Sequence, residues 1–139
     1  MDTHSGLTMQ PIGFVESPLT DLALAPRQSD LGAPEAWLVI TPQFADGLAG
    51  ITADSDMLLL TWLDQARRDV LSVHPQGDPE NPMTGVFATR SPHRPNPFGI
   101  HRVHIVDIHE NRIHVRNLEA LNGTPVLDLK PVRGTHEED

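Results

Sequence analysis

Short hydrophobic runs alternate with polar positions along most of the chain and end at proline, glycine or asparagine. Runs of about four to eight residues bounded by such turn residues are typical of β-strands. The pattern predicts strands at 10–17, 35–40, 57–63 and 123–132, and a hairpin centred on His109–Asn111. The run at 57–63, MLLLTWL, is apolar on both faces, which indicates a central strand.

After the hairpin, the alternation predicts that Ile113, Val115 and Asn117 share one face of a strand. Thirteen prolines and ten glycines favour strands joined by turns over long helices. One or two helical turns are expected within 41–50, because a threonine stands at the N-cap position and a proline follows it. Another helical turn is possible at 64–71. Loops are expected at 21–34 and 74–85.

Six or more short strands with little helix predict a mainly β fold, namely a small single-domain β-barrel with short helical turns and long loops. A length of 139 residues fits one domain that can bury a hydrophobic core. We expect this domain to span 1–139, with frayed termini at about 1–8 and 134–139.

The composition restricts the cellular compartment and the binding partners that we expect for the protein. No apolar run approaches the roughly 20 residues that cross a bilayer, and the first residues lack the basic and apolar regions of a secretory signal. These features predict a cytoplasmic protein that does not bind membranes. The absence of cysteine excludes disulfides, thiolate metal sites and cysteine nucleophiles. A formal net charge of −9 argues against indiscriminate nucleic-acid binding, and we expect no DNA partner.

The charge is unevenly distributed. Residues 81–106 contain no Asp or Glu but hold Arg90, Arg94 and Arg102. Within this interval the loop 89–99, TRSPHRPNPFG, has three prolines that restrict its backbone, so that less entropy is lost when a ligand binds. Guanidinium groups match carboxylates or phosphates. The combination favours a preorganised anion-binding loop over a set of solvated surface arginines.

Two further patterns leave alternatives open. Asp128 and Lys130 share one strand face, either as an exposed ion pair or as charges that flank a polar ligand. Among the eight histidines, His101 and His104 are three apart and point to opposite faces of a strand, while His104 and His114 can meet across the hairpin. Because no third ligand converges with them, we expect no metal site. Glycine-rich phosphate loops, GxSxG elbows and Rossmann strand–helix alternation are absent from the sequence.

Three groups of motifs carry a family resemblance: IGFVESPL and PRQ near the start, GVFATRSPHRPNPFGI in the middle, and LNGTPVLDLKPV near the end. Their order and spacing resemble the TsaA-like family (TrmO, YaeB-like), whose members are S-adenosylmethionine-dependent tRNA methyltransferases. The resemblance covers nearly the whole chain. It implies a β-barrel homodimer that binds S-adenosylmethionine near the subunit boundary and methylates N6 of threonylcarbamoyladenosine beside the tRNA anticodon.

By motif position, the resemblance implies that the following residues surround the cofactor or the target base: Gln28, Arg90, Ser91, Arg94, Asn96 and Gly99. The resemblance also implies that Asp128 and Lys130 belong to this site, and that Asp128 is a further ligand of the cofactor. Asp128, Lys130 and Arg90 are the expected catalytic residues. The cofactor's carboxylate suits an arginine, and its ribose and adenine suit Asp or Asn. We hypothesise that the N6 proton is removed by a carboxylate such as Asp128, or by water.

Several positions depart from the family pattern, and they keep other functions open. The stretch ADSDMLLLTW replaces an FSH-like stretch, Asn122 stands where DGTP has its aspartate, and His101 replaces a small polar residue. The alternatives are a noncatalytic barrel that binds S-adenosylmethionine or a small anion, a family methyltransferase with another substrate, and an RNA-binding module without cofactor chemistry. Contact with the anticodon loop is expected to use the arginines, with base stacking on Phe98, Phe87 or a tryptophan.

Overall fold

The computed structural model describes residues 6–19 and 35–133. Its main strands are β1 (Gly13–Glu16), β2 (Glu35–Ile40), β3 (Asp56–Trp62), β6 (Phe98–His109), β7 (Arg112–Arg116) and β8 (Pro125–Pro131). Its other elements are the 3-10 turns η3 (Pro42–Leu48), η4 (Pro75–Gly77) and η5 (Val86–Ala88), and the short strands β4 (Ser72–Val73) and β5 (Thr84–Gly85). The predicted mainly β fold is confirmed. In the described ranges, no helix is long and apolar enough to cross a membrane.

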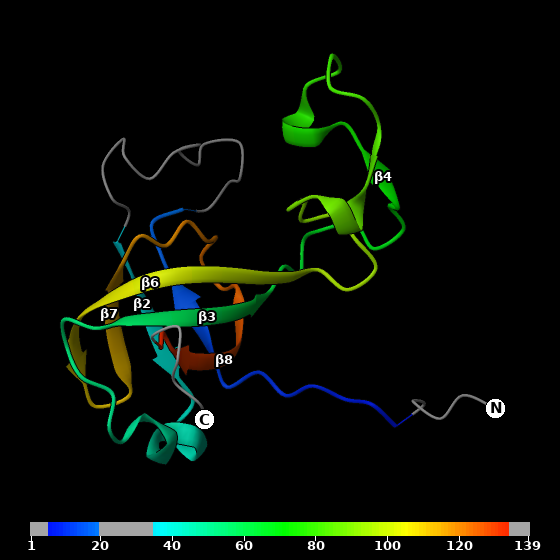
Figure 1. The fold of residues 1–139 in the computed structure, drawn as a ribbon. Helices are drawn as coiled ribbons and strands as arrows, with labels where there is room; N and C mark the ends of the chain where they lie inside the picture. Colours follow the sequence, from blue (N-terminus) through cyan, green and yellow to red (C-terminus); the bar gives the residue numbers. More distant parts are fainter. Residues whose placement is uncertain (1–5, 20–34, 134–139) are drawn as a thin grey trace.

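The six main strands form one antiparallel sheet in the order β1-β2-β7-β6-β3-β8 (Figure 1). β8 pairs again with β1, so that each strand has a partner on both sides and the sheet closes on itself. A closed sheet has no free edge that could pair with another chain. The predicted central strand is confirmed, since β3 lies between β6 and β8.

Alternation along the strands sends one set of side chains inside the closed sheet. On β3, Met57, Leu59 and Thr61 are buried, whereas Leu58 and Leu60 are only half-buried on the outer face. Inward residues of the other strands complete the core: Val15, Leu38, Ile40, Val103, Ile105, Ile113, Val115 and Val126. β3 is therefore apolar on both faces, as predicted.

The predicted hairpin is confirmed, with β6 and β7 joined at Glu110 and Asn111. The prediction for Asn117 is wrong: Ile113 and Val115 are buried, but Asn117 is exposed. Its φ of 67° lies in the left-handed region, which asparagine tolerates better than most residues. The strand ends at Arg116, and the alternation stops there.

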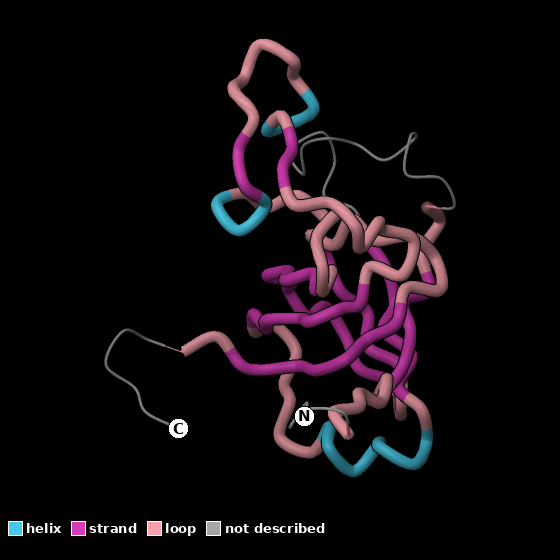
Figure 2. The backbone as a smooth tube through the Cα atoms, turned by 90° about the vertical axis from the view of Figure 1, so that its right-hand side faces the viewer, coloured by secondary structure: helices cyan, strands magenta, loops and turns pink. Residues whose placement is uncertain are grey.

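Between β3 and β6 the chain leaves the closed sheet and forms an arm, residues 64–97, that extends beyond the end of the sheet (Figure 2). β4 and β5 pair within it as a separate two-stranded sheet. The helical turn considered for 64–71 is not formed, because these residues make a turn and bends. The predicted loop 74–85 includes η4 and β5. The predicted loop 21–34, which contains Gln28, lies wholly outside the described residues, and so do most of the expected frayed ends.

Candidate functional site

A cavity of about 260 Å³ opens where the arm joins the closed sheet. Its wall is formed by Leu19, residues 63–66 after β3, Pro92 and His93 of the loop, His101 of β6, and residues 119–121 with Thr124 before β8. Most of this wall is apolar, as is usual for small-molecule sites. The cavity therefore borders the predicted anion-binding loop 89–99.

His101 lines the cavity from the inner face of β6, and Gly99 lies two residues before it on the same face. Nε2 of His101 lies 2.9 Å from Oγ1 of the buried Thr61. A Cβ on Gly99 would collide with that hydroxyl and lie 2.8 Å from Nε2 of His101. Gly99, predicted near the cofactor, thus makes room for the Thr61–His101 pair. Burial lowers the pKa of the His101 imidazole below its ordinary value of 6.5, so that the ring is neutral at pH 7.

This depressed pKa predicts a loss of stability in mild acid. In the unfolded chain His101 takes up a proton near its ordinary pKa of 6.5, whereas in the folded chain it does so only at lower pH. The free energy of unfolding should therefore fall as the pH drops below 6.5. In urea unfolding from pH 7.5 to 5, His101→Asn should flatten this slope. Equal slopes in wild type and His101→Asn would contradict the assignment.

Arg94 is tied to the backbone of its own loop. Its Nε donates to the Ser91 carbonyl at 2.8 Å, and its Nη2 donates to the carbonyls of Val86 and Thr89, each at 2.6 Å. Its backbone N–H donates to the Arg67 carbonyl at 3.0 Å. Because the fork binds carbonyls of 86–91, Arg94 fixes the loop from within.

Arg68 braces the same loop from the other side. Its Nε donates to the Pro95 carbonyl at 2.6 Å, and its Nη2 donates to Oδ1 of Asn96 at 3.1 Å. Its guanidinium also lies 5.2 Å from the centre of the Trp62 ring. Sequence reasoning missed Arg68, since an arginine beside Arg67 resembles an ordinary surface charge and its partners lie more than 25 residues further on.

Arg90 differs from the other arginines near the site. It is exposed, and within the described part of the chain it has no hydrogen bond or ion pair. By contrast, Arg67 pairs with Asp69 at 2.9 Å. Ser91, the next predicted residue, accepts a hydrogen bond from the His93 N–H at 3.2 Å. Of the two arginines predicted to bind the cofactor, only Arg90 has a guanidinium free for a ligand.

Asp128 and Lys130 lie on the outer face of β8, opposite Leu60 and Leu58 of β3. Both are exposed, and Nζ of Lys130 lies 4.0 Å from Oδ2 of Asp128. Such a pair contributes little to stability. Asp128 borders a second cavity, of about 750 Å³, beside η3. In the described chain, neither residue lines the cavity beside the loop, and no hydrogen bond or ion pair joins them to it.

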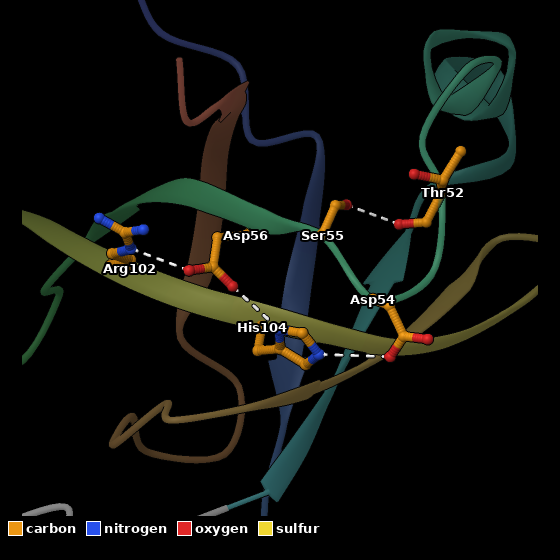
Figure 3. Close-up of polar contacts among 6 residues, drawn as sticks. All are labelled: Thr52, Asp54, Ser55, Asp56, Arg102 and His104. Atoms are coloured by element: carbon orange, nitrogen blue, oxygen red, sulfur yellow. Dashed lines mark hydrogen bonds and ion pairs between the residues drawn. The ribbon is translucent and has the colours of Figure 1, made fainter. Parts of the chain in front are cut away.

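The third arginine of the acid-free interval is neutralised by its neighbours (Figure 3). Nε of Arg102 lies 3.0 Å from Oδ2 of Asp56, whose Oδ1 lies 2.9 Å from Nδ1 of His104. The other ring nitrogen of His104 lies 3.5 Å from Oδ1 of Asp54. The hydrogen bonds from His104 and then Arg102 lower the pKa of the Asp56 carboxyl. This network lies on the outer face of the sheet, whereas His101 faces inward, as their spacing predicts.

The two histidines of the hairpin do not meet. His104 is opposite Arg116, and His114 is opposite Asp107 and forms an ion pair with Glu35 at 3.1 Å. Over residues 6–19 and 35–133, the structure holds no group of three or more His, Asp or Glu side chains able to bind a metal ion.

Glu119 is a polar residue of the cavity that sequence reasoning missed. Its Oε1 is buried and has no hydrogen-bond partner among the described residues. In the sequence it stands between Leu118 and Ala120, both buried, so that an acidic residue in the apolar stretch NLEAL was the available signal. A buried carboxylate oxygen without a hydrogen-bond partner is rare in native structures and calls for an explanation.

The comparisons with known proteins bear on this geometry. A sequence model described as the tRNA-methyltransferase O N-terminal domain matches residues 14–136. The chain belongs to this family. The match includes every residue of the cavity wall and of the loop 89–99, so the site lies wholly within the tRNA-methyltransferase O N-terminal domain.

Individual relatives share this domain. An S-adenosyl-L-methionine-binding protein of Archaeoglobus fulgidus is 43% identical over 124 residues, which cover 89% of this chain and 88% of the relative. A "Probable S-adenosyl-L-methionine-binding protein" of Methanothermobacter thermautotrophicus is 38% identical over 125 residues, with coverages of 90% and 89%. The crystal structure of TrmO from Pseudomonas aeruginosa has a TM-score of 0.72 at 31% identity, and the match covers 91% of this chain but 55% of that one. This chain thus matches little more than half of the solved TrmO chain.

Proposed function

We propose that the chain binds S-adenosylmethionine in the cavity beside the loop 89–99 and transfers its methyl group to tRNA, at N6 of threonylcarbamoyladenosine next to the anticodon. The observation that carries the proposal is the cavity itself. An apolar wall, a buried carboxylate oxygen without a donor, and a free guanidinium two residues before the wall occur together in a tRNA-methyltransferase O domain. Relatives of similar length are named S-adenosyl-L-methionine-binding proteins, which supports the choice of cofactor.

The residues present fit this cofactor. Leu63, Pro92 and Leu121 offer an apolar wall for an adenine ring. Glu119 can accept a hydrogen bond from an amino or hydroxyl group. Arg90 can bind the cofactor's carboxylate with two parallel hydrogen bonds. Gln28, proposed as a further ligand, lies outside the described residues, and its role rests on the PRQ motif.

When bound, the cofactor supplies an electrophilic methyl group on a sulfonium. The chain's own contribution is to position it, because alignment of the reacting atoms accounts for much of the rate of such transfers. Arg94 and Arg68 hold the loop, with Ser91 and Asn96 as parts of it, and this bracing would keep Arg90 in place for its ligand. Gly99 leaves room for His101.

The homodimer implied by the family resemblance is also a proposal, supported by the outer face of β3 and β6. Phe98 and Ile100 are 46% and 51% exposed and lie opposite Trp62 and Leu60. Exposed apolar patches of this kind often mark interfaces. Asp128, paired with Leu60 on the other side of β3, borders the patch. In a dimer built on this face, Asp128 and Lys130 would lie at the subunit boundary, where Asp128 could serve as the proposed base.

The arm supplies a candidate contact for tRNA. Phe87 of η5 is 80% exposed, three residues before the free Arg90. Proteins that recognise RNA loops commonly stack unpaired bases on aromatic rings and bind phosphates with arginine. Of the two phenylalanine candidates for stacking, Phe87 is more accessible than Phe98, whose ring packs edge-on against Trp62.

The test uses the purified chain. Calorimetry should show binding of S-adenosylmethionine, and Arg90→Ala should weaken it by about ten- to hundredfold, as expected for a lost charge-assisted pair. Arg116→Ala is the matched control, because Arg116 is exposed on β7 outside the loop. Methyl incorporation into tRNA from a strain lacking this modification should follow, and sedimentation equilibrium should give twice the chain mass of 15.3 kDa.

The outcomes separate the candidate functions. Binding of the cofactor without methyl transfer to any RNA would favour a noncatalytic S-adenosylmethionine-binding protein, which the names of the relatives also suggest. Methyl transfer to an RNA without threonylcarbamoyladenosine would show that the enzyme acts on a different substrate. No binding at all would remove the enzymatic proposal.

A further inference from the structure

The charges around the cavity are unbalanced. Its described wall includes four ionisable side chains, Asp64, His93, His101 and Glu119, and neither Lys nor Arg. Asp64 is exposed at the rim. Glu119 is different, because its Oε1 is shielded from solvent and receives no hydrogen bond from the protein. Burying a carboxylate oxygen without a partner is unfavourable, so a ligand that brings positive charge or a donor is favoured there.

The two histidines already have partners within the protein. Nδ1 of His93 accepts a hydrogen bond from the Arg67 N–H at 3.0 Å. Nε2 of His101 contacts the Thr61 hydroxyl, and burial of the ring disfavours its charged form. The described wall therefore combines a buried carboxylate oxygen without a donor, an imidazole whose charged form is disfavoured, and no Lys or Arg. This combination favours a ligand that carries positive charge.

We propose that Glu119 makes this cavity selective for the charge on the ligand's sulfur, so that the sulfonium methyl donor binds more tightly than the neutral thioether that remains after transfer. The inference rests on the proposed function and names a specificity residue for it. During transfer the methyl group leaves the sulfur for the acceptor nitrogen. The sulfur keeps the electron pair of the broken bond and becomes neutral, and the nitrogen loses a proton.

Shape alone discriminates poorly between donor and product, since they differ by one methyl group and one positive charge. A single methyl in an apolar pocket changes affinity only modestly. A carboxylate shielded from water distinguishes a charge more strongly, because Coulomb energies increase as the effective dielectric falls. Preferential loss of the neutral product would free the site for the next donor.

Calorimetric titration of the full chain with S-adenosylmethionine and with S-adenosylhomocysteine tests the proposal. Wild type should bind the sulfonium on the order of tenfold more tightly than the thioether. Glu119→Gln keeps the side-chain shape and removes the charge, so it should weaken sulfonium binding by about the same factor and leave thioether binding nearly unchanged. Asp46→Asn, at an exposed position of η3 outside this cavity, is the matched control and should retain the preference.

A third ligand makes the test independent of any variant. The amine analogue of the donor carries a protonated carbon-bound amine in place of the sulfonium, and wild type should bind it as tightly as the donor. Binding only as tight as the thioether would overturn the proposal. Equal weakening of both sulfur ligands by Glu119→Gln would also overturn it, since Glu119 would then contact the ammonium that they share. In either case cofactor binding itself stands, whereas failure of wild type to bind any of the three ligands would remove the proposed function as well.

Discussion

Replacing Gly13 with alanine is expected to lower the free energy of unfolding by about 3 kcal/mol or more, and to leave little folded protein at 37 °C. A Cβ at this position would collide with the Val39 carbonyl oxygen and lie 3.0 Å from Cα of Ile40. These are backbone atoms of β2, which is also paired with β7, so they cannot move without opening the sheet. Gly13 pairs with both β2 and β8, at the point where the sheet closes.

Urea unfolding followed by circular dichroism measures this effect. Gly47→Ala is the matched control, because nothing lies within 4 Å of a Cβ there and the position is in η3. That substitution should change stability by less than about 1 kcal/mol. If Gly13→Ala unfolds at the same urea concentration as the control, β1 does not pack as closely against β2 as described.

The fold was predictable where local pattern and pairing agree. β2 begins and ends at the predicted residues, because Glu35–Ile40 alternates and a Thr-Pro dipeptide follows it. β1 is shorter than the predicted 10–17, because its ends are set by its pairing partners on β2 and β8. The partners on β8 lie more than 100 residues further along the chain. The arm was not predictable as a unit. It depends on contacts such as those of Arg68 with Pro95 and Asn96, which no local pattern reveals.

The candidate site was predicted as a loop but not as a set of roles. The acid-free interval and its prolines predicted that the loop 89–99 is a binding loop. In the structure this loop borders a cavity. Arg90 and Arg94 are the same residue type four positions apart, and only the surrounding carbonyls decide which one is free. Asp128 and Lys130 were assigned to this site by motif position, which carries no information on whether they reach it within one chain or across two.

Arg94→Met is expected to weaken binding of S-adenosylmethionine by about ten- to hundredfold, although the described cavity wall does not include Arg94. The substitution removes the hydrogen bonds to the carbonyls of Val86, Thr89 and Ser91. Without them the backbone around Arg90 is no longer fixed, and ordering it again on binding costs conformational entropy. Stability should fall by about 1–3 kcal/mol, because the part-buried carbonyl oxygens of Thr89 and Ser91 lose the donors that Arg94 supplies.

Two comparisons separate a positioning residue from a direct ligand. Arg94→Lys keeps the charge but cannot reproduce the fork, so it should behave like Arg94→Met if Arg94 acts through the loop. If lysine restores affinity, Arg94 binds the ligand by its charge. In a double-mutant cycle, Arg94→Met should add little to the loss already caused by Arg90→Ala, since Arg94 affects affinity by holding Arg90 in place. Additive losses would show that the two guanidinium groups bind the cofactor independently, in which case the carbonyl contacts of Arg94 must rearrange when the ligand binds.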